Sequence, residues 1–238
     1  MPDKMRIEIA PNQEVTALVY TAGKPDLAGV MVILGHGAGA DQGSDFMTRF
    51  ATGIAARGIN AVTFNFLYTE QGRRVPDANK ALETCFRAVI EAARHKKIGR
   101  GTLVIGGKSM GGRIASQVAA ASPPCVEGLV FLGYPLHPPG RADQLRAKHL
   151  PDIAVPMLFV QGSRDAFGSP DELRPVIKEL KPPADLYVAE GGDHSFKVLK
   201  RAGVTQEDTY KAVLDRIELW LRQTFANRIG DQKCRSAK

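Results

Sequence analysis

Ser109 stands between Gly107 and Gly111 in a G-x-S-x-G pattern. An apolar run, 103–105, precedes the pattern and apolar residues at helical spacing follow it, which predicts a buried strand, a tight turn and a helix. A serine that attacks a carbonyl must project from such a turn, where side chains at the flanking positions would collide with neighbouring backbone. The helix would also point its N-terminal N–H groups toward negative charge that develops near Ser109. The pattern therefore predicts a nucleophilic serine.

The same stretch partly matches a phosphate-binding loop, G-x-x-x-x-G-K-[ST]. Residues 107–109 are Gly-Lys-Ser, but the first glycine of that pattern would fall at position 102, which is Thr102. The phosphate-loop interpretation therefore fails. A glycine-rich turn with a structural serine remains the alternative, because short motifs often match by chance. The partners of a reactive serine must be sought elsewhere in the chain.

A second glycine-rich stretch, residues 35–40, follows the apolar run 30–34. Its sequence, Gly-His-Gly-Ala-Gly-Ala, fits the loose dinucleotide-binding pattern G-x-G-x-x-G/A, so a nucleotide-binding oxidoreductase is a rival interpretation. That pattern also requires an acidic residue near the end of the next strand, where this chain has Phe-Asn-Phe-Leu at 64–67. The missing acid counts against a bound dinucleotide.

In a serine hydrolase the same loop has a different task, because it supplies a backbone N–H group to the oxyanion of acyl transfer. We expect Ala38 to contribute that N–H, facing the N–H of Met110 across the oxyanion. His36, Gly37 and Gly39 are expected to shape the loop and not to take part in the chemistry.

Two further loops carry groups that could act with Ser109. Asp165 follows the apolar strand predicted at 155–161, where the alternative is an ordinary surface turn. His194 lies in Gly-Gly-Asp-His-Ser-Phe, residues 191–196, after the last predicted strand, where a general base would be placed. The order of serine, aspartate and histidine along the chain is the nucleophile, acid and histidine order of α/β-hydrolases.

Asp193 and three other histidines are the rivals of this assignment. Asp193 adjoins the proposed base in sequence, and the side chains of neighbouring residues usually point apart, so Asp165 is preferred as the acid. His95, His137 and His149 all occur before the last predicted strand. The base is therefore assigned to His194.

Strands and helices alternate along most of the chain. Two segments of alternating polarity, 6–9 and 15–20, predict an antiparallel hairpin at one edge of a sheet. The other segments predict strands at 30–34, 59–66, 103–105, 126–132, 155–161 and 186–189, and helices that begin near residues 44, 82, 110, 171 and 205. This order indicates a mostly parallel sheet with helices on both faces. Such folds bind ligands at the carboxyl ends of their strands.

The 238-residue chain is 44% hydrophobic, which suits one α/β domain over residues 1–225, followed by a basic tail at 226–238 that is expected to be disordered. An apolar run of about 18 residues and a signal-like N-terminus are both absent from the sequence, so we expect a cytoplasmic protein without a membrane partner.

The three cysteines, Cys85, Cys125 and Cys234, are odd in number and widely spaced, which indicates neither disulfides nor a zinc site. The formal charge of +7 is spread along the chain without a nucleic-acid-binding pattern, so no nucleic-acid partner is expected.

Four motifs together resemble a known family. Residues 35–39, 107–113, 162–165 and 191–196 are similar to those of small dienelactone-hydrolase-like α/β-hydrolases. The similarity is closest to the branch that includes bacterial predicted hydrolases, a testis-expressed animal protein and a subunit of an animal histone-acetyltransferase complex. Dienelactone hydrolase itself uses a cysteine where this chain has Ser109, so the resemblance does not imply that substrate. Some relatives act as complex subunits, which leaves a role without catalysis open.

We therefore expect an α/β-hydrolase fold and a serine hydrolase that cleaves a small ester, thioester or related acyl substrate, without a metal or an organic cofactor. The segment 134–154 is too short for a large helical cap, so a small, open pocket is expected. Lys108, Arg113, Arg141 and Arg146 could favour an acidic acyl or alcohol group, with solvated charge as the alternative. A hydrolase-fold interaction protein and a nucleotide-binding oxidoreductase are the other candidates. The sequence neither supports nor excludes a homo-oligomer.

Overall fold

One mixed sheet runs through the molecule. The structure is a computed structural model that describes residues 1–23, 29–96, 101–121, 126–199 and 203–235, with side chains as far as residue 225. In these residues the strand order is β1-β2-β4-β3-β5-β6-β7-β8. The strands are β1 (Asp3–Ala10), β2 (Gln13–Tyr20), β3 (Met31–Gly35), β4 (Asn60–Phe64), β5 (Leu103–Lys108), β6 (Gly128–Leu132), β7 (Met157–Gly162) and β8 (Ala184–Ala189). The predicted hairpin β1–β2 is antiparallel and joins β4 antiparallel, whereas all pairs from β4 to β8 are parallel.

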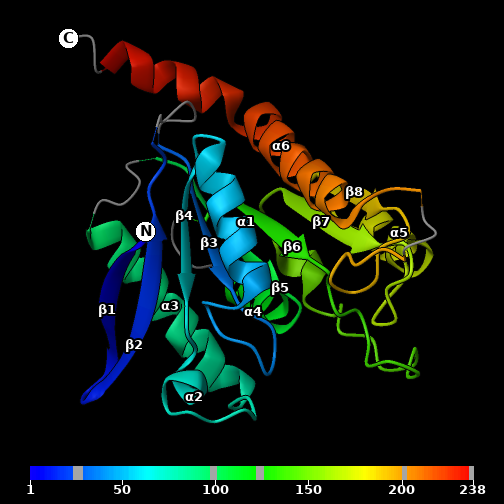
Figure 1. Cartoon of the computed structure of the whole chain (residues 1–238), viewed down its shortest axis with the longest axis horizontal. Helices are drawn as coiled ribbons and strands as arrows, with labels where there is room; N and C mark the ends of the chain where they lie inside the picture. The colour runs from blue at the N-terminus through cyan, green and yellow to red at the C-terminus, as the bar shows by residue number, and fades with distance from the viewer. Residues whose placement is uncertain (24–28, 97–100, 122–125, 200–202, 236–238) are drawn as a thin grey trace.

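Helices cover both faces of the sheet. They are α1 (Asp45–Ala56), α2 (Leu67–Glu70), α3 (Asn79–His95), α4 (Met110–Ala120), α5 (Pro170–Lys178) and α6 (Gln206–Arg235), with a 3₁₀ turn at Leu150–Asp152. Apolar residues of α1 and α6 form one core cluster, and those of α3, α4 and α5 form the other on the opposite face. Figure 1 shows α1 and α6 in front of the sheet and α3 and α4 behind it. The predicted fold class is therefore confirmed.

The pattern of apolar residues explains this arrangement. Every residue of β3, β5 and β6 is buried, as expected for central parallel strands that are covered by helices on both faces. The edge strand β1 alternates exposed and buried residues because one of its faces meets solvent. The short helix α2 and the 3₁₀ turn were not predicted, since a single turn leaves too few positions for a periodic pattern.

The last helix begins where the sequence predicts it but continues further. The amide of Asp208 donates to Thr205 Oγ1 at 3.0 Å, which caps the helix. The helical backbone then continues to Arg235, past the expected end of the domain near residue 225. The stretch 226–235 contains no proline to stop the helix, and the expected disorder of the tail 226–238 stays a prediction. The division into a domain and a tail stays a prediction.

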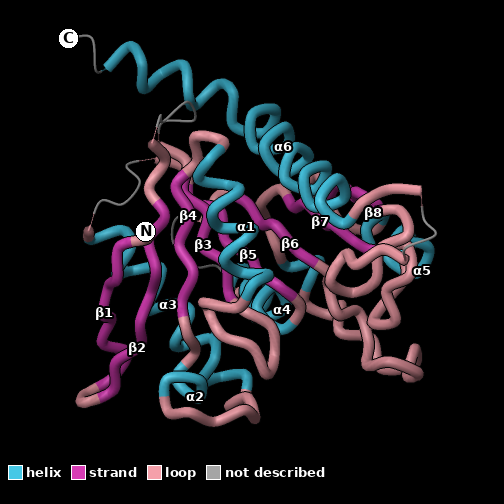
Figure 2. The backbone as a smooth tube through the Cα atoms, viewed as in Figure 1, coloured by secondary structure: helices cyan, strands magenta, loops and turns pink. Residues whose placement is uncertain are grey.

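The loops that follow the parallel strands lie at one edge of the sheet. These loops start after Gly35, Lys108, Leu132, Gly162 and Ala189. Figure 2 shows long loop segments below and to the right of the sheet in that view. The site must therefore be sought where these loops meet.

No helix in the described part of the chain is long and apolar enough to span a membrane.

Candidate functional site

Ser109 occupies a strained turn between β5 and α4. Its φ of 51° and ψ of −116° are unusual for a residue with a side chain. The turn packs directly on the backbone at Gly35: a Cβ atom at Gly107 would lie 2.8 Å from Gly35 N, and one at Gly111 would overlap the Gly35 carbonyl. Glycine is required at both positions because backbone meets backbone there. The predicted strand, tight turn and helix are confirmed.

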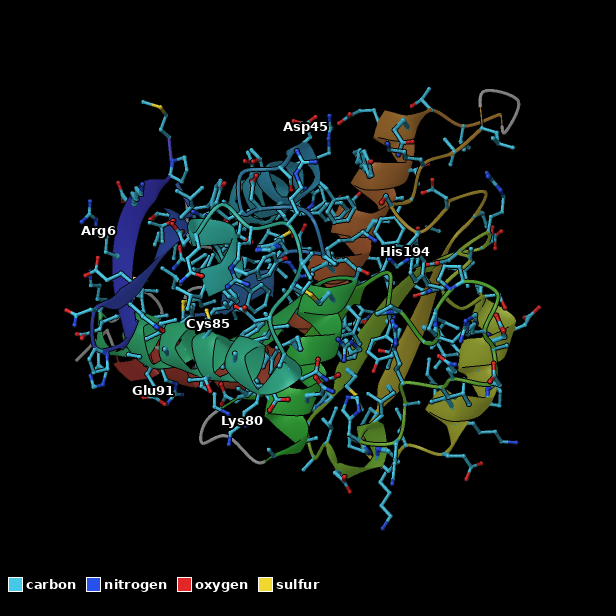
Figure 3. The ribbon with its side chains drawn as sticks, turned by 90° about the horizontal axis from the view of Figure 1, so that it is seen from below. Arg6, Asp45, Lys80, Cys85, Glu91 and His194 are labelled. Carbon is cyan, nitrogen blue, oxygen red and sulfur yellow. The ribbon has the colours of Figure 1, made fainter. Side chains whose placement is uncertain are left out.

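Ser109, His194 and Asp165 form a continuous chain of hydrogen bonds. His194 Nε2 lies 2.8 Å from Ser109 Oγ, and His194 Nδ1 lies 2.7 Å from Asp165 Oδ2. With its proton on Nδ1, the imidazole donates to the carboxylate and leaves Nε2 free to accept the serine proton. Figure 3 labels His194 in the half of the molecule opposite Arg6 of the N-terminal hairpin. The loops after β5, β7 and β8 thus bring together the three residues singled out in the sequence.

Asp165 is held by two further donors. Phe167 N donates to Asp165 Oδ1, and Gln161 Nε2 donates to Asp165 Oδ2, each at 2.8 Å. Gln161 is fully buried on β7 and also bonds the carbonyl of Gly168 and the amide of Tyr134. These bonds keep the carboxylate oriented toward the imidazole. The sequence analysis missed Gln161, although a lone glutamine at the end of an apolar strand was the available signal.

Asp193 has a different role in the structure. Its Oδ1 accepts from the amides of Ser195 at 2.7 Å and Lys197 at 2.9 Å, which closes the turn that carries His194. The carboxylate is therefore engaged with its own loop, and Asp165 is the one that bonds the imidazole. The geometry agrees with the choice that the sequence favoured.

His36, His137 and His149 have partners away from Ser109. His36 is fully buried, its Nδ1 lies 2.8 Å from Gly37 O, and its Nε2 accepts from Phe66 N at 3.3 Å. Burial lowers the pKa of His36, as expected for a neutral ring that shapes a loop. The ring of His137 lies 3.2 Å from a glutamate oxygen and that of His149 lies 2.7 Å from a serine hydroxyl.

The loop 35–40 lies against the turn that carries the serine. A Cβ atom at Gly37 would lie 3.6 Å from Ser109 Cβ, so the space between the two glycine-rich segments is no larger than one such side-chain atom would fill. Ala38 and Met110 both line the cavity beside the serine. This placement is compatible with two oxyanion donors, and their role stays a prediction.

Lys108 and Phe167 adjoin His194 from two sides. The Phe167 ring stacks on the imidazole with centroids 4.2 Å apart. Lys108 Nζ donates to the His194 carbonyl and lies 5.5 Å from the Phe46 ring centroid. Burial lowers the pKa of Lys108 to about 7. Burial also lowers the pKa of His194, the bond to Asp165 raises it, and the charge of Lys108 lowers it further.

A cavity of about 570 Å³ opens at Ser109 and His194. Its volume is in the range of small-molecule pockets. The segment 134–154 beside it contains loops and one 3₁₀ turn, as expected for a chain without a large cap. Arg113 and Arg146 line the cavity together with Lys108, but Arg141 does not. Within the described residues, no group of three or more His, Cys, Asp and Glu side chains is arranged to hold a metal ion.

Comparison with known proteins assigns the family. The alpha/beta hydrolase domain model matches residues 28–222, and the chain belongs to this family. A dienelactone hydrolase from Anabaena variabilis shares 17% identity at a TM-score of 0.74, over 94% of this chain and 98% of its own. An alpha-beta serine hydrolase homologue from Coxiella burnetii shares 19% identity at a TM-score of 0.71, over 92% of this chain and 97% of its own. A serine hydrolase without a lid from Xanthomonas campestris shares 20% identity at a TM-score of 0.69, over 93% of this chain and 94% of its own. At these identities the likeness concerns the fold.

Proposed function

We propose that the protein is a serine hydrolase that cleaves a small ester, thioester or related acyl substrate. The observation that carries the proposal is the hydrogen-bonded chain Ser109–His194–Asp165, with links of 2.8 and 2.7 Å, at the wall of a cavity. Each of the three groups needs the next one for acyl transfer, so their assembly from distant loops is difficult to explain by folding alone. The four sequence motifs favour the branch of dienelactone-hydrolase-like proteins named above.

The geometry suits a two-stage acyl transfer. Ser109 Oγ attacks the carbonyl carbon while His194 Nε2 takes the hydroxyl proton, and the imidazolium then gives that proton to the leaving group. Water repeats the sequence on the acyl-enzyme and releases the acid. The Asp165 carboxylate holds the imidazole through Nδ1–H and stabilises its transient positive charge. The amides of Met110 and Ala38 would donate to the oxyanion in both stages.

Two alternative functions are less well supported. A nucleotide-binding oxidoreductase would need an acidic residue near the end of β4, and Asn65 stands there with its amide bound to Gln42 and Glu70. An interaction protein without turnover would have no need for the strained backbone of Ser109 or for the bond from His194 to its hydroxyl. The intact set of groups therefore favours an enzyme.

Labelling by a fluorophosphonate tests the proposal, because this probe reacts with an activated serine hydroxyl. We expect covalent labelling at Ser109, located by mass spectrometry of the modified peptide, together with hydrolysis of p-nitrophenyl acetate. Ser109→Ala should lose both properties and keep its melting temperature, while Ser195→Ala, which alters another serine in the cavity wall, should retain labelling at Ser109. A stable parent protein that neither reacts with the probe nor hydrolyses the ester would contradict the proposal.

A further inference from the structure

The walls of the cavity differ in chemical character. Apolar side chains form much of the lining, among them Phe46, Met47 and Leu82. The charged lining residues, apart from His194, are three cations, Lys108, Arg113 and Arg146, and one carboxylate, Asp77. Lys108 is engaged with the His194 loop, as described above. The two arginines are not explained by the proposed chemistry.

Both arginines are held in position by the fold. Arg113 lies in the first turn of α4, and its amide donates to the carbonyl of Ser109 at 3.0 Å. Arg146 lies on the loop after β6, where its amide donates to Leu136 O at 2.7 Å and its carbonyl accepts from the hydroxyl of buried Tyr134 at 2.8 Å. Their main-chain positions are therefore fixed relative to the nucleophile, although one lies on a helix and the other on a loop.

No carboxylate neutralises this pair in the described part of the chain. Neither Arg113 nor Arg146 forms an ion pair there; Arg113 donates to the neutral Asn79 side chain at 3.2 Å. Asp77 is already bound to Arg73 at 2.7 Å. Burial lowers the pKa of Arg113, and the nearby charge of Arg146 lowers it further, whereas Tyr134 and Glu83 act in the opposite direction. Two positive charges thus repel each other at the wall of the cavity.

The ring of His149 lies against the helix that carries Arg113. Its Nε2 lies 2.7 Å from Ser116 Oγ, on the helix that carries Arg113. Burial lowers the pKa of His149, and the charge of Arg113 lowers it further, against a smaller effect of Asp152. The environment of Arg113 therefore already disfavours another cation. An anion would relieve the repulsion.

We infer that Arg113 and Arg146 form a binding subsite for an oxyanion, a carboxylate or a phosphate group, on the substrate of the proposed hydrolase. Guanidinium groups present parallel N–H donors that match such groups, and the bonds are strengthened by charge. The inference rests on the proposed function for its meaning as a substrate site. The substrate is then a small acyl compound with an apolar part, which contacts the apolar lining, and an anionic end.

Matched ester pairs test the subsite. On the acyl side, p-nitrophenyl hemiglutarate is compared with its neutral methyl ester; on the alcohol side, 3-acetoxybenzoate is compared with methyl 3-acetoxybenzoate. We expect kcat/KM for the anionic member of at least one pair to exceed that of the neutral member about 10- to 100-fold, the range typical of hydrogen bonds to charged groups. Inhibition of p-nitrophenyl acetate hydrolysis by glutarate and by methyl phosphate then distinguishes carboxylate from phosphate recognition.

Variants locate the effect on the two arginines. Arg113→Gln and Arg146→Gln should each lower the anionic-to-neutral ratio about tenfold or more, measured within the same variant so that general losses cancel. Arg141→Gln is the matched control, because Arg141 is an exposed arginine on the same loop as Arg146 but outside the cavity lining. The anionic-to-neutral ratio of this variant should equal that of the parent. Melting temperatures verify that each variant is folded.

The outcomes separate the subsite from the proposed function. Turnover of the neutral esters with a ratio near one for both pairs would overturn the subsite and leave the hydrolase intact. Absence of all turnover and of fluorophosphonate labelling would instead overturn the hydrolase. In that case calorimetry of glutarate and methyl phosphate still tests the subsite, since binding that is lost in Arg146→Gln supports it and absence of binding to the parent overturns it.

Discussion

The turn that carries Ser109 and the loops that carry Asp165 and His194 are held in place by different forces. The turn depends on steric contact, because the backbones at Gly35, Gly107 and Gly111 meet where no side chain fits. The acid and base loops also meet in a close backbone contact at Gly162, but their catalytic side chains are oriented by directed hydrogen bonds.

This difference determines which substitutions each side should tolerate. The turn should accept a loss of polarity at Ser109 but no added volume at its glycines. Away from Gly162, the loops should accept small changes of shape but no loss of the charge or the acceptor that a partner needs. Substitutions at the glycines of the turn should therefore reduce stability strongly, whereas substitutions in the acid and base loops should reduce activity far more than stability.

The largest effect is expected for Gly111→Val. A branched side chain at this position would overlap the Gly35 carbonyl, and backbone cannot move aside as a flexible side chain can. We expect the free energy of unfolding to fall by about 3 kcal/mol or more, measured by urea unfolding, with loss of activity. Gly23→Val is the control, because a Cβ atom there meets no atom of the described residues within 4 Å. A Gly111→Val protein as stable as this control would show that the turn does not depend on steric contact.

Asp165→Asn should affect activity far more than stability. The amide keeps the size of the side chain but removes the charge and favours the wrong tautomer of His194. On the scale known for serine proteases, kcat on p-nitrophenyl acetate should fall about 10³–10⁴-fold with little change in KM. A loss of kcat of less than tenfold would show that His194 does not depend on the Asp165 carboxylate.

Lys108→Met should move the pH profile. Catalysis needs neutral His194, so kcat/KM falls as the pH drops through the pKa of this residue, which burial lowers from its ordinary value of 6.5. The cation of Lys108 lowers that pKa further, while Asp165 and Asp193 raise it. Removal of the cation should therefore shift the acid limb to higher pH. Lys197→Met, at an exposed lysine on the loop that carries His194, should leave the limb in place. An unshifted limb in Lys108→Met would contradict this account.

Asp193→Asn should have the smallest effect. The asparagine side chain retains an oxygen that can accept from the amides of Ser195 and Lys197, so the turn can keep both bonds. We expect kcat to change by less than about threefold, because the carboxylate does not contact the imidazole nitrogen. A loss comparable to that of Asp165→Asn would mean that charge near His194, and not its direct bond, governs the activity.

Much of the fold and the core of the site could be predicted because their signals are local. The glycines around Ser109, the apolar strand before it and the helical spacing after it lie within one short segment, and backbone sterics fix their geometry. The order of Ser109, Asp165 and His194 after β5, β7 and β8 followed from the alternation of strands and helices. That alternation reflects periodic burial, which a sequence displays directly.

The tertiary structure alone decided how the side chains are paired. It joined the Asp165 carboxylate, which the sequence already favoured over Asp193, to the imidazole at 2.7 Å, and it assigned Gln161 to hold that carboxylate. It also separated Arg113 and Arg146, in the cavity wall, from Arg141 outside the lining.

These pairings join residues far apart in the chain, and they depend on where the loops after β6, β7 and β8 converge. The sequence determined which groups were available at the edge of the sheet. Their distances and directions depended on the packing of the whole domain, because a hydrogen bond is made or lost within a few tenths of an ångström, a precision that no local pattern encodes.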